Sequence, residues 1–260
     1  MPRWLQLLLP FGLVRAWQLR DNLVDLGLSR DRAWQLARQP RVPAELKQCN
    51  LNLLPAGALT RVDAVVDVGA NRGEWTALAL KFCNPMTVLT VEPDPKLAGD
   101  LRERFASEPR VRVLETAVGQ ARGQATFHRM RNSVNNSFLN PAPEMAARLP
   151  NDLAIQDSIE VRVSTIDELT AATPHISVLK IDVEGFERQA LLGAEQTLAK
   201  TDFLLLEVRF EPFYEGQSDF FEINQLLNAR GFHLSNYSPP QGGSKRALFA
   251  DALYIHKDLG

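Results

Sequence analysis

Two carboxylates separated by one residue, Asp182 and Glu184, could act as acid or base at the end of a buried strand. They follow the apolar run Ile176-Ser177-Val178-Leu179-Lys180-Ile181 and precede Gly185, where a helix would start. A carboxylate near a hydroxyl can take its proton, and two carboxylates at one point can hold Mg²⁺ or Ca²⁺. The two acids share a side if the strand continues and diverge if the helix has begun. Asp182 could instead cap that helix.

A glycine-containing turn earlier in the chain has the features of a nucleotide site. The strand Ala64-Val65-Val66-Asp67-Val68 runs into Gly69-Ala70-Asn71-Arg72-Gly73, a G-x-x-x-G spacing, and then into a helix. Gly69 allows a sharp bend, and Gly73 allows close approach to a ligand. A dinucleotide fingerprint has glycine where this chain has Asn71. The turn therefore favours adenosine over a dinucleotide, although such turns also occur as plain α/β architecture.

Glu92 ends a second predicted strand, Thr87-Val88-Leu89-Thr90-Val91, in a position suited to a ribose. An acid at the tip of the second parallel strand can accept hydrogen bonds from ribose hydroxyls. Pro93 and Pro95 lack N–H donors and stop the strand before the next helix. The glycine turn and Glu92 together predict an adenosine site at the carboxyl edge of a sheet.

The remaining pattern alternates strands and helices, which predicts a Rossmann-like α/β fold with a doubly wound, mainly parallel sheet. Expected strands cover 63–68, 87–92, 111–116, 176–182 and 202–208, and expected helices cover 73–82, 96–107, 186–199 and 219–229. Strands at 232–237 and 251–256 flank a Pro/Gly loop and predict a C-terminal antiparallel hairpin. Thr165 and Glu168 are spaced as a capping box, so Asp167 and Glu168 are expected to be structural.

The alternation fails between residues 117 and 165. Short strands are expected near 124–128 and 158–163, on either side of a polar loop with Arg129, Arg131 and several Asn and Ser side chains. Long loops in compact domains are usually functional or disordered, and we interpret this one as a lid over an acceptor site. Its composition suits a polar acceptor, including an anionic one.

Composition indicates a globular protein. The 260 residues are 45% hydrophobic and 23% charged, with a formal net charge of −2. No bulk basic charge invites nucleic acid, so no nucleic-acid partner is expected. Cys49 and Cys83 form neither a metal spacing nor a disulfide framework, which favours thiols in a reducing compartment, the cytoplasm. His175, His233 and His256 show no zinc spacing, and no metal is indicated.

The first 60 residues are expected to form a helical extension and linker before a main domain at 61–260. The apolar run from Trp4 to Val14 is interrupted by Gln6 and Pro10, and it is too short to span a bilayer. Amphipathic spacing predicts two helices up to Gln39. We expect them to cap the main domain, with peripheral membrane contact or partner binding as the alternative.

The D-V-G-A-N-x-G segment at 67–73 and the K-I-D-V-E-G-F-E segment at 180–187 resemble the FkbM family of S-adenosylmethionine-dependent methyltransferases. The resemblance covers residues 62–256 and implies a methyltransferase domain at 61–260. It implies O-methylation of a hydroxyl on a saccharide, such as a glycan or lipid-linked sugar, or on a natural product. The residues that it implies at S-adenosylmethionine are Asp67, Gly69, Ala70, Asn71, Gly73, Glu92, Pro93, Asp94, Thr116, Ala117, Val118 and Asp182.

Methyl transfer to a hydroxyl needs an aligned acceptor and a base. The predicted catalytic carboxylates are Asp182, Glu184 and Glu207. In the resembling family an acid follows the strand that ends at Glu207, whereas a surface ion pair with Arg209 is the alternative. Lys180 could pair with the site carboxylates and lower their basicity. His128 is expected to be structural rather than a base.

Two other classes of function stay open at this point. A nicotinamide-dependent oxidoreductase would explain the strand-turn-helix unit and Glu92, but not the missing middle glycine or the acidic segment. A catalytically silent methyltransferase-like binding module would keep the cofactor turn and lose the acceptor carboxylates. Because this chain retains those carboxylates, an active methyltransferase is expected.

Overall fold

The structure is a computed structural model that describes residues 50–55, 58, 61–243 and 246–259. The predicted helices up to Gln39, and Cys49, lie outside these residues, so the helical extension at 1–60 stays a prediction. Cys83 is buried. No helix in the described part of the chain is long and apolar enough to cross a membrane.

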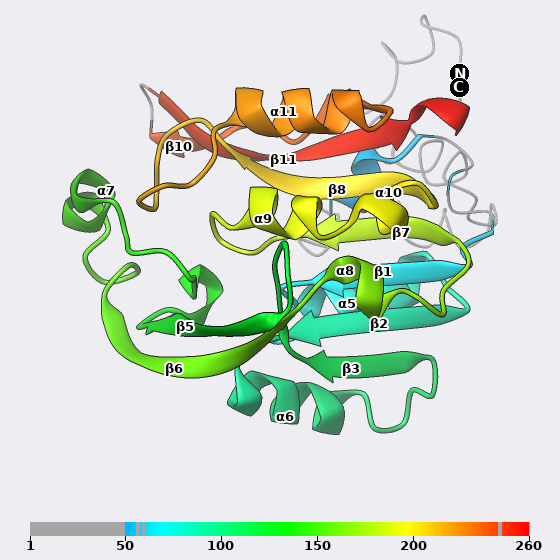
Figure 1. Cartoon of the computed structure of the whole chain (residues 1–260), viewed down its shortest axis with the longest axis horizontal. Coiled ribbons are helices and arrows are strands. Elements are labelled where there is room, and N and C mark those ends of the chain that lie inside the picture. The colour runs from blue at the N-terminus through cyan, green and yellow to red at the C-terminus, as the bar shows by residue number, and fades with distance from the viewer. Residues whose placement is uncertain (1–49, 56–57, 59–60, 244–245, 260) are drawn as a thin grey trace, which may run out of the picture.

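An eight-stranded, mainly parallel sheet forms the centre of the fold (Figure 1). Its strands are β1 (Ala64–Val68), β2 (Thr87–Glu92), β3 (Val111–Glu115), β7 (Ile176–Ile181), β8 (Thr201–Arg209), β9 (Phe232–Tyr237), β10 (Gln241–Gly243) and β11 (Arg246–His256). They are ordered β10-β11-β8-β7-β1-β2-β3, and β9 also pairs with β11. The neighbouring strands β8, β7, β1, β2 and β3 are parallel to one another. Strand β11 is antiparallel to β8, β9 and β10. The parallel sheet and the C-terminal hairpin are thus confirmed, and the Pro/Gly loop adds strand β10.

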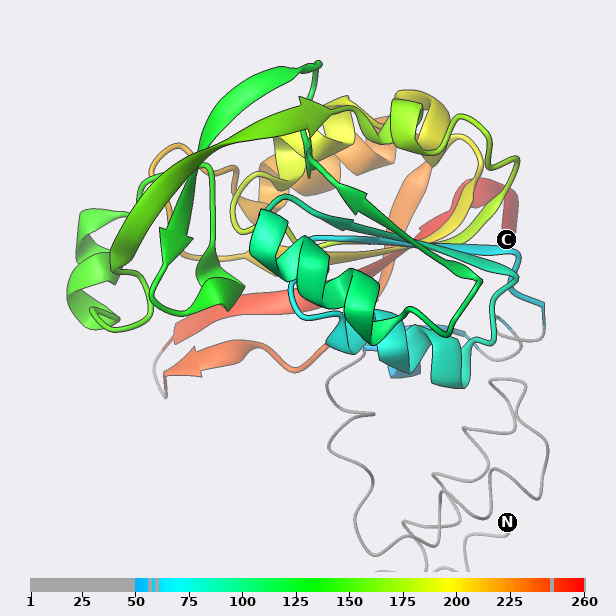
Figure 2. The same cartoon turned by 90° about the horizontal axis from the view of Figure 1, so that it is seen from below.

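Helices cover both faces of the sheet, which confirms the doubly wound arrangement (Figure 2). One face carries α5 (Glu74–Phe82) and α6 (Pro95–Arg104), and the other carries α8 (Ile166–Leu169), α9 (Glu187–Leu192), α10 (Glu195–Leu198) and α11 (Phe220–Ala229). Val66 and Leu179 belong to the core under α9 to α11, whereas Val65 and Val178 belong to the core under α5. Successive strand side chains point to opposite faces, so each central strand contributes to both cores.

The prediction of one helix at 186–199 is wrong in one respect, because the segment is divided into α9 and α10. The break lies at Gly193, where an added Cβ would sit 2.1 Å from the carbonyl oxygen of Gly119. The Gly193 carbonyl also accepts a hydrogen bond from the backbone N–H of Asp167 (3.0 Å). This close approach of two backbones replaces helical hydrogen bonding at that point. The helix expected at 96–107 also ends earlier, at Arg104.

The irregular region between residues 117 and 165 is an insertion beside the carboxyl ends of the parallel strands (Figure 1). Strands β4 (Ala117–Val118), β5 (Gly123–Met130) and β6 (Ile155–Ser164) form a separate sheet in the order β4-β6-β5. The polar loop between β5 and β6 contains η2 (Ser133–Asn135) and α7 (Pro143–Arg148), which the sequence pattern did not predict. The capping box of Thr165 and Glu168 is confirmed, and Asp167 accepts hydrogen bonds from Thr197 in α10.

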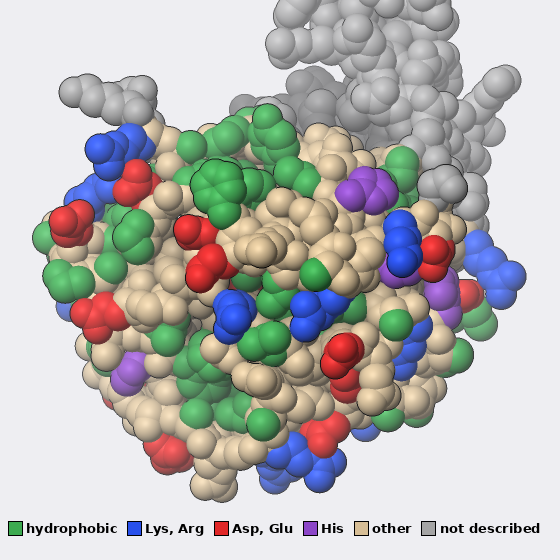
Figure 3. Space-filling model, turned by 45° about the horizontal axis from the view of Figure 1, so that its top comes forward, with side chains coloured by type: hydrophobic (Ala, Val, Ile, Leu, Met, Phe, Trp, Pro, Cys, Tyr) green, Lys and Arg blue, Asp and Glu red, His purple; other side chains and the backbone are tan. Residues whose placement is uncertain are grey.

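An aromatic cluster is exposed where α11 begins. Phe221 is 75% exposed and its ring lies 5.4 Å from that of Phe220, which lies 5.8 Å from that of Phe210. Figure 3 shows hydrophobic side chains gathered on the face of the molecule that carries α11. Single exposed apolar side chains are ordinary on protein surfaces, whereas these three neighbouring rings form a hydrophobic surface patch.

The contact between β1 and β7 generates the first prediction. Gly69 has a φ of +80°, and a Cβ there would lie 1.8 Å from the Asp182 carbonyl oxygen. We expect Gly69→Ala to lower the free energy of unfolding by at least about 2 kcal/mol, since strain and clash add. Gly99 lies within α6 with nothing near its Cβ position. Urea denaturation should show Gly99→Ala to be stabilising by about 0.5–1 kcal/mol, and near-equal stability of the two variants would contradict the prediction.

Candidate active site

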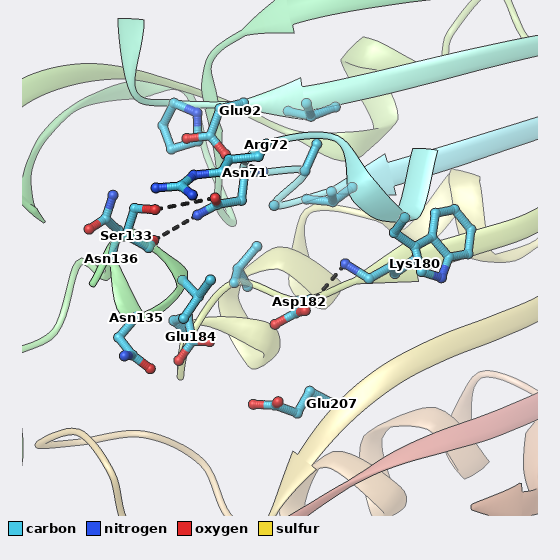
Figure 4. A pocket seen from close by; sticks show the side chains of 18 of the residues that line it. Asn71, Arg72, Glu92, Ser133, Asn135, Asn136, Lys180, Asp182, Glu184 and Glu207 are labelled. Carbon is cyan, nitrogen blue, oxygen red and sulfur yellow. Dashed lines mark hydrogen bonds and ion pairs between the residues drawn. The ribbon is translucent and has the colours of Figure 1, made fainter. Parts of the chain in front are cut away.

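A cavity of about 440 Å³ opens at the carboxyl ends of β1, β2, β7 and β8, within the size range of small-molecule sites. It brings together most of the residues that the sequence singled out (Figure 4). Those that line it are Gly69, Ala70, Asn71, Glu92, Pro93, Thr116, Ala117, Val118, Asp182, Glu184 and Glu207. The cavity runs from the glycine turn to the acidic side chains without interruption by another element.

Three of the predicted cofactor residues lie behind the cavity wall instead. Asp67 is fully buried, accepting a hydrogen bond from the Thr76 hydroxyl (2.6 Å) and one from the Lys180 ammonium group (3.4 Å). Gly73 has a φ of +74° and precedes α5, and a Cβ there would clash with α6 side chains. Asp94 caps α6 by accepting backbone hydrogen bonds from its first turn. Asp67 and Gly73 thus support the glycine turn after β1, and Asp94 supports the turn between β2 and α6.

Glu92 is held rigidly at the cavity wall. Its Oε2 accepts the backbone N–H of Asn71 (2.8 Å), and its Oε1 accepts that of Asp94 (2.9 Å). Burial raises its pKa to about 7, despite these two hydrogen bonds. A carboxylate has about four acceptor positions, so each oxygen can still accept a hydrogen bond from a ligand hydroxyl.

Asn71 also attaches the lid, which we define as residues 132–138. Its φ is +49°, and its side-chain amide donates to the Ser133 carbonyl (2.7 Å) while its amide oxygen accepts from the Ser133 hydroxyl (3.3 Å). The far side of the lid is attached as well, since the Ser137 hydroxyl donates to the Glu184 carbonyl (2.7 Å) and the Tyr214 hydroxyl donates to the Asn135 carbonyl (3.0 Å). The lid therefore contacts both the glycine turn and the acidic turn.

The carboxylates of Asp182, Glu184 and Glu207 converge, with one oxygen of each within 4.8 Å of the others. Strand β7 ends at Ile181, so strand alternation does not explain this. Glu184 instead has a φ of +53°. The Glu187 carboxylate accepts the backbone N–H groups on either side of Glu184, at 3.2 and 3.1 Å, and holds the turn in place. This left-handed turn brings Glu184 back beside Asp182.

Arg209 lies between two of these acids. Its Nη2 is 2.5 Å from Glu184 Oε2 and 2.5 Å from Glu207 Oε1. The guanidinium is 4.3 Å from the ring centroid of Phe213, and the side chain is only 5% exposed. The Tyr214 hydroxyl donates to the same Glu184 oxygen (2.7 Å). Glu207 and Arg209 are thus a buried pair at the cavity rather than a surface ion pair.

Burial and crowding of like charges alter proton affinities in this cluster. Burial raises the pKa of Glu184 to about 7, with Asp182 and Glu187 adding to the rise and Arg209 and Tyr214 opposing it. Burial also raises the pKa of Glu207 well above its usual value, against the attraction of Arg209. A carboxylate with a pKa near neutrality is suited to general-base catalysis.

Lys180 and Arg209 at the cavity already engage these acids. The Lys180 ammonium group is 3.2 Å from Asp182, so the expected pairing of Lys180 with the site is present. Among the described residues, Asp182, Glu184 and Glu207 are the group spaced closely enough to hold a metal ion. One oxygen of each acid is already ion-paired with Lys180 or Arg209.

Sequence reasoning missed several side chains of the wall. Phe127 of β5 and Phe138 of the lid line the cavity beside Ala117, with their rings 5.2 Å apart. Trp75 of α5, a buried core residue, also lines it. Their apolar types were visible in the sequence, but nothing in the pattern placed the insertion at this edge. His128 hydrogen-bonds Ser158 outside the cavity wall, in line with its expected structural role.

The attachment of the lid by Asn71 leads to a second prediction. Asn71→Gly keeps the left-handed backbone accessible and removes both side-chain hydrogen bonds to Ser133. We expect amide hydrogen exchange in residues 132–138 to accelerate by about fivefold or more, because two hydrogen bonds of modest net strength are lost. Asn84→Gly is the matched control, since Asn84 also has positive φ (47°) and pairs with Arg110 instead. Equal exchange in the two variants would show that Asn71 does not hold the lid.

Comparisons with known proteins identify the family of this chain. Residues 67–234 match the family model described as the methyltransferase FkbM domain. The 2-O-methyltransferase NoeI from Sinorhizobium fredii is 26% identical over 172 residues, which are 63% of this chain and 70% of that protein. The hexuronic acid methyltransferase AglP from Haloferax volcanii is 26% identical over 149 residues, 56% of each chain. A crystal structure of methyltransferase FkbM from Methylobacillus flagellatus shares the fold, with a TM-score of 0.53 and 17% identity over 94% of this chain and 60% of that one. The chain belongs to the FkbM family of methyltransferases.

Proposed function

We propose that this protein transfers the methyl group of S-adenosylmethionine to a hydroxyl of a saccharide. The observation that carries the proposal is the single cavity that joins the Glu92 turn to three converging carboxylates. Of two relatives, one is named for 2-O-methylation and the other for a hexuronic acid, which is a sugar acid. The family, the cavity and these names support the same class of reaction.

The Glu92 end of the cavity fits S-adenosylmethionine, whose sulfonium supplies an electrophilic methyl group. Glu92 retains acceptor positions on both carboxylate oxygens for the two ribose hydroxyls. Ala117 and the ring of Phe127 offer apolar surface for adenine. Asp182 lies at the junction of the two halves of the cavity and would face the ammonium group of the methionine part.

The acceptor end fits a sugar. Carboxylates accept hydrogen bonds from hydroxyl groups, and sugar rings also present apolar C–H faces. The rings of Phe213 and Phe249 line the same part of the cavity, 6.0 Å apart. Carboxylates beside aromatic rings match both properties of a sugar.

We assign Glu207 as the general base. Its carboxylate lines the cavity, burial raises its pKa and with it its basicity, and within the described part of the chain its ion-pair partner is Arg209. Glu184 is more constrained, because Tyr214 and Arg209 both contact its Oε2. In the transfer, the acceptor oxygen would bond to the methyl carbon while the bond from that carbon to the sulfonium sulfur breaks and S-adenosylhomocysteine leaves. The hydroxyl proton would pass to Glu207, whose carboxylate Arg209 stabilises before transfer. Glu184 fixes Arg209 in place.

The buried carboxyl of Glu92 predicts pH-dependent cofactor binding. A raised pKa of about 7 means that Glu92 is ionised at pH 8 and protonated at pH 6. The protonated form loses acceptor capacity, so we expect the calorimetric Kd for S-adenosylhomocysteine to rise about tenfold between pH 8 and pH 6. Glu92→Gln should bind weakly at both pH values. Glu115→Gln is the control, since Glu115 is the register partner of Glu92 on β3 and forms an exposed ion pair with Arg102. An unchanged pH dependence in Glu92→Gln would contradict this role.

Activity tests the proposal directly. Release of S-adenosylhomocysteine is measured from the full chain with S-adenosylmethionine and a panel of methyl glycosides and oligosaccharides. We expect turnover that depends on the saccharide, and a kcat at least about 100-fold lower in Glu207→Gln with an unchanged Kd for S-adenosylhomocysteine. Cofactor binding without turnover on any saccharide would reject the acceptor class. Wild-type kcat in Glu207→Gln would reject Glu207 as the base.

A further inference from the structure

The acceptor end of the cavity is crowded with negative charge. We propose that the acceptor is a saccharide without an acid group, and that uronic acids and other anionic sugars are excluded by the carboxylates at this end of the cavity. This inference rests on the proposed function and names its substrate class more narrowly. It departs from the expectation, drawn from the lid sequence, that an anionic acceptor would suit the site, and from the hexuronic acid in the name of the AglP relative, which is 26% identical.

Within the described part of the chain, four carboxylates line the proposed acceptor end of the cavity. Asp182, Glu184 and Glu207 are joined by Asp251, which also lines the cavity. Asp251 of β11 is the antiparallel register partner of Glu207 of β8, so the two side chains project from the same face of the sheet. A sugar in this space is surrounded by hydrogen-bond acceptors, which hydroxyl groups satisfy by donating and a carboxylate group does not.

Arg209 and Lys180, the cations beside these acids, are each already paired with two carboxylates and are not free to pair with an anionic acceptor. Arg209 contacts both Glu184 and Glu207, and its side chain is 5% exposed. Lys180 lies within 3.4 Å of both Asp182 and Asp67. An acceptor carboxylate would have to displace one of these acids, leaving it unpaired in a buried site.

The other cations near the cavity face elsewhere. Arg72 lines the cavity at the glycine turn, where Figure 4 shows it beside Asn71 and Glu92 rather than beside the three acids. Arg129 at the end of β5 and Arg131, just before the lid, have partners outside the cavity. Arg129 forms two hydrogen bonds of 2.6 Å with Asp157, and Arg131 contacts Asn151, and neither lines the cavity. Neither arginine is therefore placed to pair with an acceptor anion in the cavity.

Bound S-adenosylmethionine does not reverse this charge. Among the residues that the structure describes, six acidic and three basic side chains line the cavity. The sulfonium, ammonium and carboxylate groups of S-adenosylmethionine sum to a single positive charge, so an excess of acid remains. Burial, the main cause of the raised pKa values of Glu184 and Glu207, also disfavours a further negative charge at this end, and the neighbouring carboxylates add to both rises. Repulsion between like charges is a common way for a binding site to exclude a competing ligand.

Matched sugars test the inference by binding, independently of turnover. Full-chain protein saturated with S-adenosylhomocysteine is titrated at pH 8, under saturation-transfer NMR, with methyl glycosides of glucose, galactose and mannose and with the corresponding methyl uronosides. Each pair differs only at C6. We expect neutral members to bind and each uronoside to bind at least about tenfold more weakly. A uronoside that binds as tightly as its neutral partner, or failure of every neutral glycoside to bind, overturns the inference.

Charge variants identify the cause of the discrimination. Asp251→Asn removes one negative charge without altering the assigned base. We expect it to reduce the ratio of affinities between each neutral glycoside and its uronoside by about threefold or more. Asp258→Asn removes an exposed charge outside the cavity and should leave the difference unchanged. An unchanged difference in Asp251→Asn overturns the electrostatic cause. S-adenosylhomocysteine binding is measured first: its absence refutes the proposed function, whereas its presence with tight uronoside binding refutes only this inference.

Discussion

The site depends on a contact between two backbones, where Gly69 at the end of β1 meets Asp182 at the end of β7. A side chain at Gly69 would occupy the position of the Asp182 carbonyl oxygen, and the Asp182 N–H donates to the Val68 carbonyl (3.1 Å). The glycine thus sets how closely the nucleotide turn and the acidic turn approach. Because both turns follow central parallel strands, their side chains face one cavity at the switch point of the sheet.

The second requirement is a buried cation that keeps two acids together. Without Arg209, Glu184 and Glu207 would repel each other in a region from which water is largely removed. Stacking on Phe213 holds the guanidinium in place, and Tyr214 supplies a further donor to Glu184. Such an arrangement is costly to form and is not an efficient source of stability. Its consequence is chemical: Glu184, whose pKa burial raises to about 7, can exchange protons near neutral pH beside a positioned cation.

The sequence predicted features that depend on local pattern. Periodicity indicated the strands and their parallel order, and the positions of Asp182 and Glu92 after their strands indicated the edge where the cavity lies. Other features depend on contacts between distant segments. The left-handed turn at Glu184 is held by Glu187, whose acid appeared in the motif without a role. The break at Gly193 comes from its approach to the Gly119 backbone, which no helical period records.

The lid shows why the two halves of the cavity form one unit. Residues 132–138 contact Asn71 at the nucleotide end and Glu184 and Tyr214 at the acidic end. Asn71 replaces the glycine of a dinucleotide fingerprint. Its side-chain amide donates a hydrogen bond to the lid, and its backbone N–H donates one to Glu92. A glycine there would supply the same backbone conformation without the lid contact. The residue that distinguishes this turn from a dinucleotide site therefore also ties the cofactor end of the cavity to the acceptor end.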